Sequence, residues 1–141
     1  MTTDRITAAM RKYGNKIPTE NVFYLQYYLK EASDDCFEEF MSLRTKGKIR
    51  TLLFSIFLGD FAVDRFYVGD VGEGCVKLLL RWIPVLLFIF SSNWLLDLLI
   101  VICGLAYLIW YIVDIFVTYK IAMKVNYEIL SSFLIRHKET V

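Results

Sequence analysis

Charged side chains inside an apolar stretch are the residues of this sequence best placed to do chemistry. Asp60, Asp64 and Arg65 follow the apolar run 52–58, and a long, mostly apolar segment comes after them. Insertion of a charged side chain at the centre of a bilayer costs about 2.5–3.5 kcal/mol. We therefore expect these three groups to pair with one another, to reach water or to face protein.

Four acids in this stretch are candidate ion ligands: Asp60, Asp64, Asp70 and Glu73. Carboxylate oxygens suit calcium or magnesium, although the order of these residues does not match an EF-hand loop. A buried salt bridge beside a polar turn explains the same acids without a metal, and we favour that interpretation. In an oligomer the acids would instead form a ring along a cation path.

The spacing of these residues also indicates how they are held. A continuous helix over Thr51–Val68 would place Asp60 and Asp64 on one face, four residues apart. Ser55 and Gly59 form a pair of small residues at the same spacing, which permits another helix to approach closely. Three glycines then allow a sharp reversal of the chain: Gly69, Gly72 and Gly74.

Several sequence blocks here resemble the signature of a known family. They are Leu58-Gly59, Val63-Asp64-Arg65-Phe66-Tyr67, Gly69-Asp70-Val71-Gly72, Lys77-Leu78-Leu79, then Trp110 to Phe116 and Lys120 to Tyr127. Together they are similar to the TM2-domain (two-transmembrane) family, the last block resembling the basic tail of bacterial members. Its bacterial members have no defined function, and eukaryotic relatives are associated with signalling and endolysosomal membranes. The chain departs from the pattern at Asp60 and Glu73, and by an apolar insertion over 81–103.

The resemblance implies a set of residues that hold a membrane hairpin together: Gly59, Asp64, Arg65, Phe66, Tyr67, Gly69 and Asp114. Asp114 matches the aspartate of the closing aromatic segment of the family. We expect Asp114 either to pair with Arg65 or to accept hydrogen bonds from backbone amides at the glycine-rich turn.

Composition divides the chain into a membrane part and a polar part. Of its 141 residues 57% are hydrophobic and 22% are charged, too apolar for an ordinary soluble domain and too charged for a chain wholly inside lipid. The net charge of +1 gives no reason to expect a nucleic-acid partner. The expected environment is the lipid bilayer.

Enzyme motifs are lacking in this sequence. The single histidine, His137, lies in a polar tail, where a surface residue is more common than a general base. Cys36, Cys75 and Cys103 have neither disulfide nor zinc spacing. We therefore predict a non-enzymatic protein with no catalytic residue, no metal centre and no cofactor.

Basic residues predict the orientation in the membrane. Arg44, Lys46, Lys48 and Arg50 precede the first apolar run and form a positive anchor beside lipid headgroups. Lys120 and Lys124 flank the last apolar segment, so the positive-inside rule places both ends of the membrane region in the cytoplasm. We expect a multi-pass protein of the cell membrane with a cytoplasmic N-terminus.

An even number of crossings follows from this orientation, but the chain has three apolar segments. We expect Thr51–Val68 and Trp94–Tyr119 to cross while Val71–Phe90 folds back or lies flat, and a three-span arrangement remains open. Ser91-Ser92-Asn93 marks a break between the last two segments.

The apolar pattern of the first 47 residues predicts a cap of short amphipathic helices. Their apolar faces are Ile6, Ala9, Met10 and Tyr13, then Val22, Leu25, Tyr28 and Leu29, then Phe37, Phe40, Met41 and Leu43. A row four residues apart, Ile121, Val125, Ile129 and Phe133, is expected to dock on this cap. The aromatics Phe23, Tyr24, Tyr27 and Tyr28 either pack the cap together, which we favour, or form a partner-binding surface.

The sequence thus predicts an all-α integral membrane protein with a cytoplasmic helical cap and a membrane hairpin of two to three helices. The predicted domains are the cap at 1–47, a TM2-type membrane domain at 48–128 and a C-terminal helix end and tail at 129–141. The favoured function is a membrane adaptor or a structural or regulatory module that binds a cytoplasmic protein through residues 1–47. The alternative is an oligomeric cation channel or ion-responsive protein that uses the acids of the membrane region.

Overall fold

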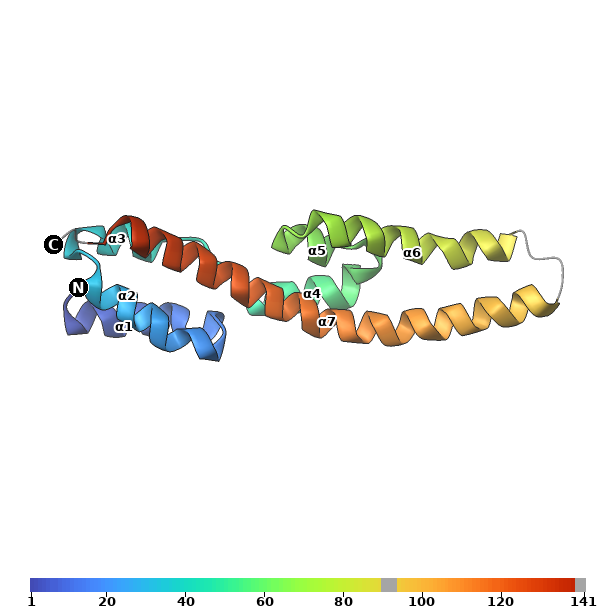
Figure 1. The fold of residues 1–141 in the computed structure, drawn as a ribbon, viewed down its shortest axis with the longest axis horizontal. Coiled ribbons are helices and arrows are strands. Elements are labelled where there is room, and N and C mark those ends of the chain that lie inside the picture. The colour runs from blue at the N-terminus through green and yellow to red at the C-terminus, as the bar shows by residue number, and fades with distance from the viewer. Residues whose placement is uncertain (90–93, 139–141) are drawn as a thin grey trace. The chain divides into compact units, whose positions relative to one another are not determined.

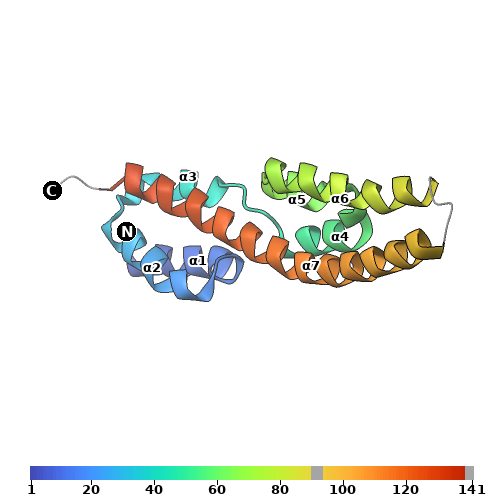
Figure 2. The same cartoon turned by 45° about the vertical axis from the view of Figure 1, so that its right-hand side comes forward.

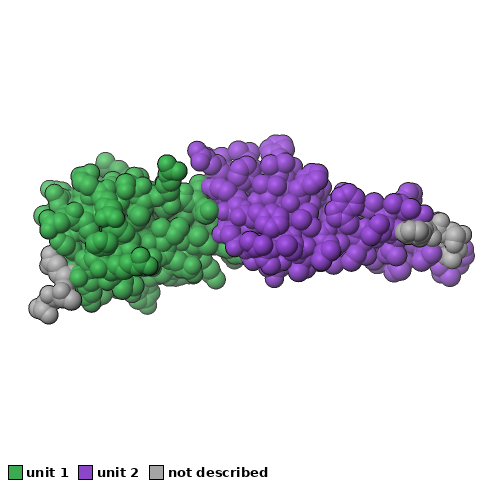
Figure 3. Space-filling view, turned by 90° about the horizontal axis from the view of Figure 1, so that it is seen from above, with its two compact units in different colours: residues 1–48, 120–141 green, residues 49–119 purple. Residues whose placement is uncertain are grey.

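The structure, a computed structural model, describes residues 1–89 and 94–138. These residues are helical, with one isolated antiparallel bridge between Ala32 and Lys138 and no strand among them. The chain divides into two compact units (Figure 3), one formed by Met1–Lys48 with Lys120–Val141 and the other by Ile49–Tyr119. The predicted break at Ser91-Ser92-Asn93 lies outside the described residues.

Unit 1 contains three short helices and the C-terminal part of a long one (Figure 1). Its helices are α1 (Thr3–Tyr13), α2 (Val22–Glu31), α3 (Phe37–Ser42) and the end of α7 (Trp94–Arg136), with 3-10 turns η1 (Gly14–Lys16), η2 (Thr19–Asn21) and η3 (Asp34–Cys36). Gly14 ends α1, and the Ser33 side chain accepts a hydrogen bond from the Asp35 amide at the start of η3. The Ser33 side chain thus caps the start of η3.

The predicted apolar faces of unit 1 meet in one core. Its buried members include Ile6, Ala9, Tyr13, Leu25, Leu29, Phe40, Leu130 and Leu134. The Tyr13 and Phe40 rings pack edge to face with centroids 5.3 Å apart. The Tyr13 hydroxyl lies 2.9 to 3.1 Å from the carbonyl oxygens of Phe40, Met41 and Leu43, so the phenol of this buried ring is satisfied.

The aromatic residues of α2 do not follow the favoured prediction. Phe23, Tyr24 and Tyr27 are 73%, 55% and 49% exposed, and only Tyr28 packs partly against the core. The prediction that these aromatics pack the cap together is therefore wrong for Phe23, Tyr24 and Tyr27. Leu25 and Leu29 form the buried stripe of α2, and Phe23, Tyr24 and Tyr27 lie off this stripe and are exposed.

The end of α7 docks on the N-terminal helices, as expected, but through a different face. The predicted row contains Phe133, which packs at the edge of the core, while Leu130 and Leu134 enter its centre. The fully buried row is shifted by one position: Ala122, Asn126, Leu130 and Leu134. A shift of one residue turns a helix face by about 100°. The docking of α7 on the N-terminal helices was therefore predicted, but the face of α7 that docks was not.

Unit 2 contains four helical segments and a tight bend. They are α4 (Lys48–Leu58), the turn η4 (Gly59–Phe61), α5 (Val63–Val68), α6 (Val71–Ile89) and the first part of α7. Ala62 adopts the left-handed conformation with φ of 54°, which ends the turn before α5 begins. The predicted continuous helix over Thr51–Val68 is therefore wrong, and Asp60 and Asp64 do not share a helix face.

Contacts with α7 show that α4 and α5 double back. The carbonyl of Ser55 on α4 bonds to Tyr111, Asp60 bonds to Tyr107, and Asp64 on α5 bonds to Thr118. The chain thus runs toward the start of α7 and then returns, as Figures 1 and 2 both show. This reversal lies within 48–68, whereas the segment expected to fold back is Val71–Phe90.

The segment expected to fold back or lie flat, Val71–Phe90, contains the helix α6, described to Ile89. It runs antiparallel to α7, because Lys77 contacts Asp114 while Arg81, one turn later, lies beside Asp60 and Tyr107. Among the described residues α7 is long and apolar enough to cross a membrane. α6 carries three ionisable residues in its first eleven: Glu73, Lys77 and Arg81.

Candidate functional site

The bend between α4 and α5 brings a pair of adjacent charged residues into the interior of unit 2. Asp64 and Arg65 occupy the first turn of α5, directly after Ala62, which is completely buried. Gly69 ends α5 with φ of 95°, and its amide donates to the carbonyls of Arg65 and Phe66. Two left-handed residues thus frame the short helix that positions the pair.

Arg65 joins α5 to α7 and to the following turn. Its Nε donates to Asp114 Oδ1 at 3.1 Å, and its Nη2 contacts the same oxygen. Its Nη1 donates to Asp70 Oδ2 at 2.9 Å. The predicted pairing of Arg65 with Asp114 is confirmed, and one guanidinium ties two acids from different elements.

Lys77 is the second cation of this network. Its ammonium donates to both oxygens of Asp64, at 3.2 and 3.0 Å, and also to Asp114 Oδ2. Lys77 and Asp114 are 1% exposed and Asp64 is fully buried. Two carboxylates and two cations therefore neutralise each other inside unit 2, with Asp70 at the edge.

Hydroxyl groups complete the surroundings of Asp64. Ser55 Oγ donates to Asp64 Oδ2 at 3.1 Å, and Thr118 Oγ1 donates to it at 3.4 Å. Both residues are fully buried. With Lys77, the carboxylate of Asp64 receives donors from α4, α6 and α7, so it connects the three helices around α5.

Gly59 and Tyr111 form a close contact beside this network. A Cβ on Gly59 would lie 3.0 Å from the Tyr111 ring. The Tyr111 hydroxyl donates to the carbonyls of Ser55 and Ile56 at 2.8 and 2.9 Å, and Lys77 Nζ lies 5.6 Å from the ring centroid. Gly59 of η4 thus admits an aromatic side chain of α7, the close approach that the pair of small residues predicts.

Comparison with family models gives a match that covers most of unit 2. The model of the TM2 domain matches residues 44–99. Residues 44–99 thus belong to a TM2 domain, and this name is used below for unit 2, which contains most of them. The match includes Asp64, Arg65 and Lys77, whereas Asp114 lies beyond its end. Comparisons with curated proteins and with solved structures gave no match.

The match to this domain and the apolar helix α7, the candidate transmembrane helix, both point to a membrane protein. The TM2 domain is not a known enzyme family. The buried network therefore belongs to a membrane domain, where paired and hydrogen-bonded charges are the form in which ionisable groups are tolerated.

Other residues of the TM2 signature pack around α5. The Tyr67 ring meets Phe54 of α4 edge to face, with centroids 5.0 Å apart. A Cβ on Gly74 would lie 3.1 Å from the Phe66 ring, so a glycine there lets α5 approach α6. These contacts fix the short helix on both sides.

The four candidate ion ligands of the TM2 domain are distributed over separate places. Asp64 faces Lys77, Asp70 faces Arg65, Asp60 faces Arg81, and Glu73 is exposed. Among the described residues no group of three or more acids, histidines or cysteines could hold a metal ion. The structure therefore brings each of the three aspartates to a cation and does not gather the four acids into one ligand set.

The backbone of the basic anchor contacts a buried side chain of α7. Arg44 and Arg50 are exposed, and Lys46 and Lys48 are partly buried. The amide of Lys46 donates to Asn126 Oδ1, and the Asn126 amide donates to the carbonyls of Lys46 and Lys16 at 3.0 and 2.9 Å. Within unit 1, a buried asparagine thus holds the segment that leads to the TM2 domain.

Sequence reasoning missed Lys77 as a site residue. It lies in a signature block, and the charge count offered a further signal, because Arg65 alone can neutralise only one of the two acids Asp64 and Asp114. Tyr111 and Asn126 also lie in signature blocks, but their roles depend on tertiary contacts that the sequence does not show.

Proposed function

We propose that this chain is a non-enzymatic, multi-pass protein of the cell membrane that acts as an adaptor or a structural or regulatory module. In this proposal α6 and α7 cross the bilayer, and α4 with α5 enters from the cytoplasmic side and returns. The observation that supports it most is the neutral, buried network of Asp64, Arg65, Lys77 and Asp114, whose ion pairs join α5, α6 and α7.

Helix lengths and exposed side chains support two crossings. α6 has 19 residues, about 28 Å, and Trp94–Tyr119 has 26, about 39 Å, against a hydrocarbon core of about 30 Å. Only 6% of the apolar window of α7 is buried, which is unlike the core helix of a soluble protein. Exposed apolar side chains on these helices include Leu79, Leu86, Phe88, Ile89, Leu98, Val101, Ile102, Leu105, Ile109 and Phe116.

Charge supports the cytoplasmic orientation. Lys48 and Arg50 begin α4, and Lys120 and Lys124 follow the apolar part of α7. Because α4 runs antiparallel to α7, these two basic groups belong to the same end of the TM2 domain. Two crossings then return the chain to the cytoplasm, in agreement with the positive-inside rule.

The exposed aromatics of α2 support the adaptor part of the proposal. Phe23, Tyr24 and Tyr27 project from unit 1, and aromatic residues are enriched in the cores of protein interfaces. We propose residues 1–47 as the part that binds a cytoplasmic protein. The cation-channel alternative has less support, because Asp60, Asp64 and Asp70 each lie beside a cation.

Cysteine labelling in intact cells tests this topology. In a background with Cys36, Cys75 and Cys103 replaced by serine, Trp94→Cys should react with a membrane-impermeant maleimide from outside. Thr7→Cys and Arg136→Cys should react only after permeabilisation. Labelling of Trp94→Cys only after permeabilisation, or of Arg136→Cys from outside, would contradict two crossings.

A further inference from the structure

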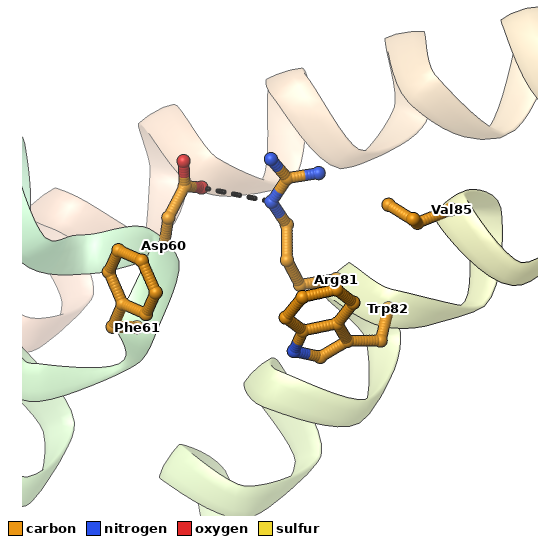
Figure 4. A pocket seen from close by; sticks show the side chains of 5 residues that line it. All are labelled: Asp60, Phe61, Arg81, Trp82 and Val85. Atoms are coloured by element: carbon orange, nitrogen blue, oxygen red, sulfur yellow. Dashed lines mark ion pairs between the residues drawn. The ribbon is translucent and has the colours of Figure 1, made fainter.

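The TM2 domain has a second ion pair that, unlike the network, is open to its surroundings. Arg81 Nε lies 3.6 Å from Asp60 Oδ1, and the Tyr107 hydroxyl donates to the same oxygen at 3.0 Å. The side chains of Arg81 and Asp60 are 42% and 48% exposed. Figure 4 shows the pair at the side of a hollow.

The depth of this pair makes its exposure costly. Tyr107 lies 13 residues after Trp94 and 13 before Lys120, which is about 20 Å from each at 1.5 Å per residue. In the membrane placement proposed above, Asp60 and Arg81 are therefore near the middle of the bilayer. Acyl chains offer no hydrogen bonds, so half-exposed charges at this depth need water or protein against them.

The hollow beside the pair has the residue types of a protein interface. It has a volume of about 140 Å³ and is lined by Asp60, Phe61, Arg81, Trp82 and Val85. Phe61 is 63% exposed and Trp82 55%. Tryptophan and arginine are the residues most enriched among those that dominate binding energy, and here both surround a charge pair.

We infer that a second copy of this chain covers the hollow, so that Asp60 of each copy faces Arg81 of the other across a two-fold axis. The inference rests on the proposed membrane placement. It adds that the face with Asp60 and Arg81 binds a second copy of the chain. A two-fold interface uses the same patch on both copies, and a patch with one anion and one cation is complementary to itself. Within the bilayer, such a copy supplies the hydrogen bonds that lipid lacks.

Charge exchange between copies tests this pairing. Asp60→Arg alone and Arg81→Asp alone place like charges across the axis, and each should lower dimer formation at least tenfold. Co-expression of the two variants restores opposite charges at both contacts between different copies, although neither chain has an internal pair. Recovery of the dimer on co-expression is the expected result.

Cross-linking in native membranes is the measurement. Copies carrying Phe61→Cys and Trp82→Cys, in the cysteine-free background and with different tags, should form a mixed disulfide-linked dimer. Ile109→Cys, at the same depth but on another part of α7, is the matched control and should cross-link at least tenfold less. Equal cross-linking at position 109 would overturn the interface.

Two further results would also overturn it. Recovery only when both exchanges are in one chain would mean that the pair acts within a single copy. Rapid labelling of Phe61→Cys by a water-soluble maleimide without cross-linking would mean that water covers the hollow. Alkaline extraction of each variant keeps the proposals separate, because a chain removed from the membrane contradicts the membrane placement itself.

Discussion

Lys77 of α6 donates a hydrogen bond to Asp114 of α7, and both side chains are almost completely buried. A buried pair of this kind adds little to stability relative to apolar residues, but removal of one partner leaves an uncompensated charge. The contact therefore makes the antiparallel arrangement of α6 and α7 specific, and loss of either charge is expected to be severe.

Replacement of Lys77 by methionine should lower the free energy of unfolding by about 3–5 kcal/mol, because Asp64 loses the one ionic partner that it has among the described residues. Thermal unfolding in detergent measures the effect. Glu73→Gln, which removes an exposed charge from the same helix, is the control and should change stability by no more than about 0.5 kcal/mol. Similar melting of Lys77→Met and the control would argue against the buried network.

The Arg65 and Asp114 pair is suited to a double-mutant cycle. Arg65→Gln and Asp114→Asn should each destabilise the protein, while the double variant should be more stable than the sum of the two changes predicts, by about 0.5–3 kcal/mol. The reason is that the second substitution removes the charge orphaned by the first. Strict additivity of the three free energies would show that the two groups do not interact.

Substitution of Gly59 by alanine should cost about 1–3 kcal/mol through overpacking. The added methyl would press on the Tyr111 ring and disturb its hydrogen bonds to α4. Gly104→Ala is the matched control, because a Cβ there meets nothing within 4 Å and alanine favours a helix. The idea fails if both alanine variants unfold at the same temperature.

Acid should weaken unit 1 through Glu31. Hydrogen bonds from Lys138 and then Tyr27 hold the pKa of Glu31 below its usual value. A depressed folded pKa gives stability that is present above the unfolded pKa, near 4.5, and is lost as the pH falls through the folded value. Glu31→Gln should therefore flatten the decline in stability below about pH 4.5.

This slope, the change in unfolding free energy with pH, is measured by chemical unfolding between about pH 3 and 6. The signal is the loss of the packed environment of Tyr13 and Phe40 in unit 1. Glu38→Gln, an exposed acid on α3, is the control and should leave the slope unchanged. An unaltered slope in Glu31→Gln would mean that the Lys138 contact does not affect folding.

Local rules predicted much of unit 1 and part of the TM2 domain. Apolar periodicity predicted Tyr13 and Leu29 as members of an apolar face, and both are core residues. The Ser55 and Gly59 spacing anticipated a close contact. In these cases the sequence signal and the structural cause lie within a few residues of each other.

The bend at Ala62 could not be predicted in the same way. Alanine carries no preference for the left-handed conformation, so local propensity favoured a continuous helix through Asp60. The reversal is maintained by contacts distant in sequence, chiefly Asp64 with Lys77 and Arg65 with Asp114. Its cause is tertiary, and the local sequence therefore predicted 51–68 as one continuous helix.

The return of α4 and α5 has a consequence for the two leaflets. With the proposed orientation, four helical segments share the cytoplasmic leaflet, whereas only α6 and α7 continue through the outer one. In that orientation the TM2 domain would displace more lipid from the cytoplasmic leaflet than from the outer one. Membranes whose curvature relieves this difference in area should accommodate it more easily than flat ones.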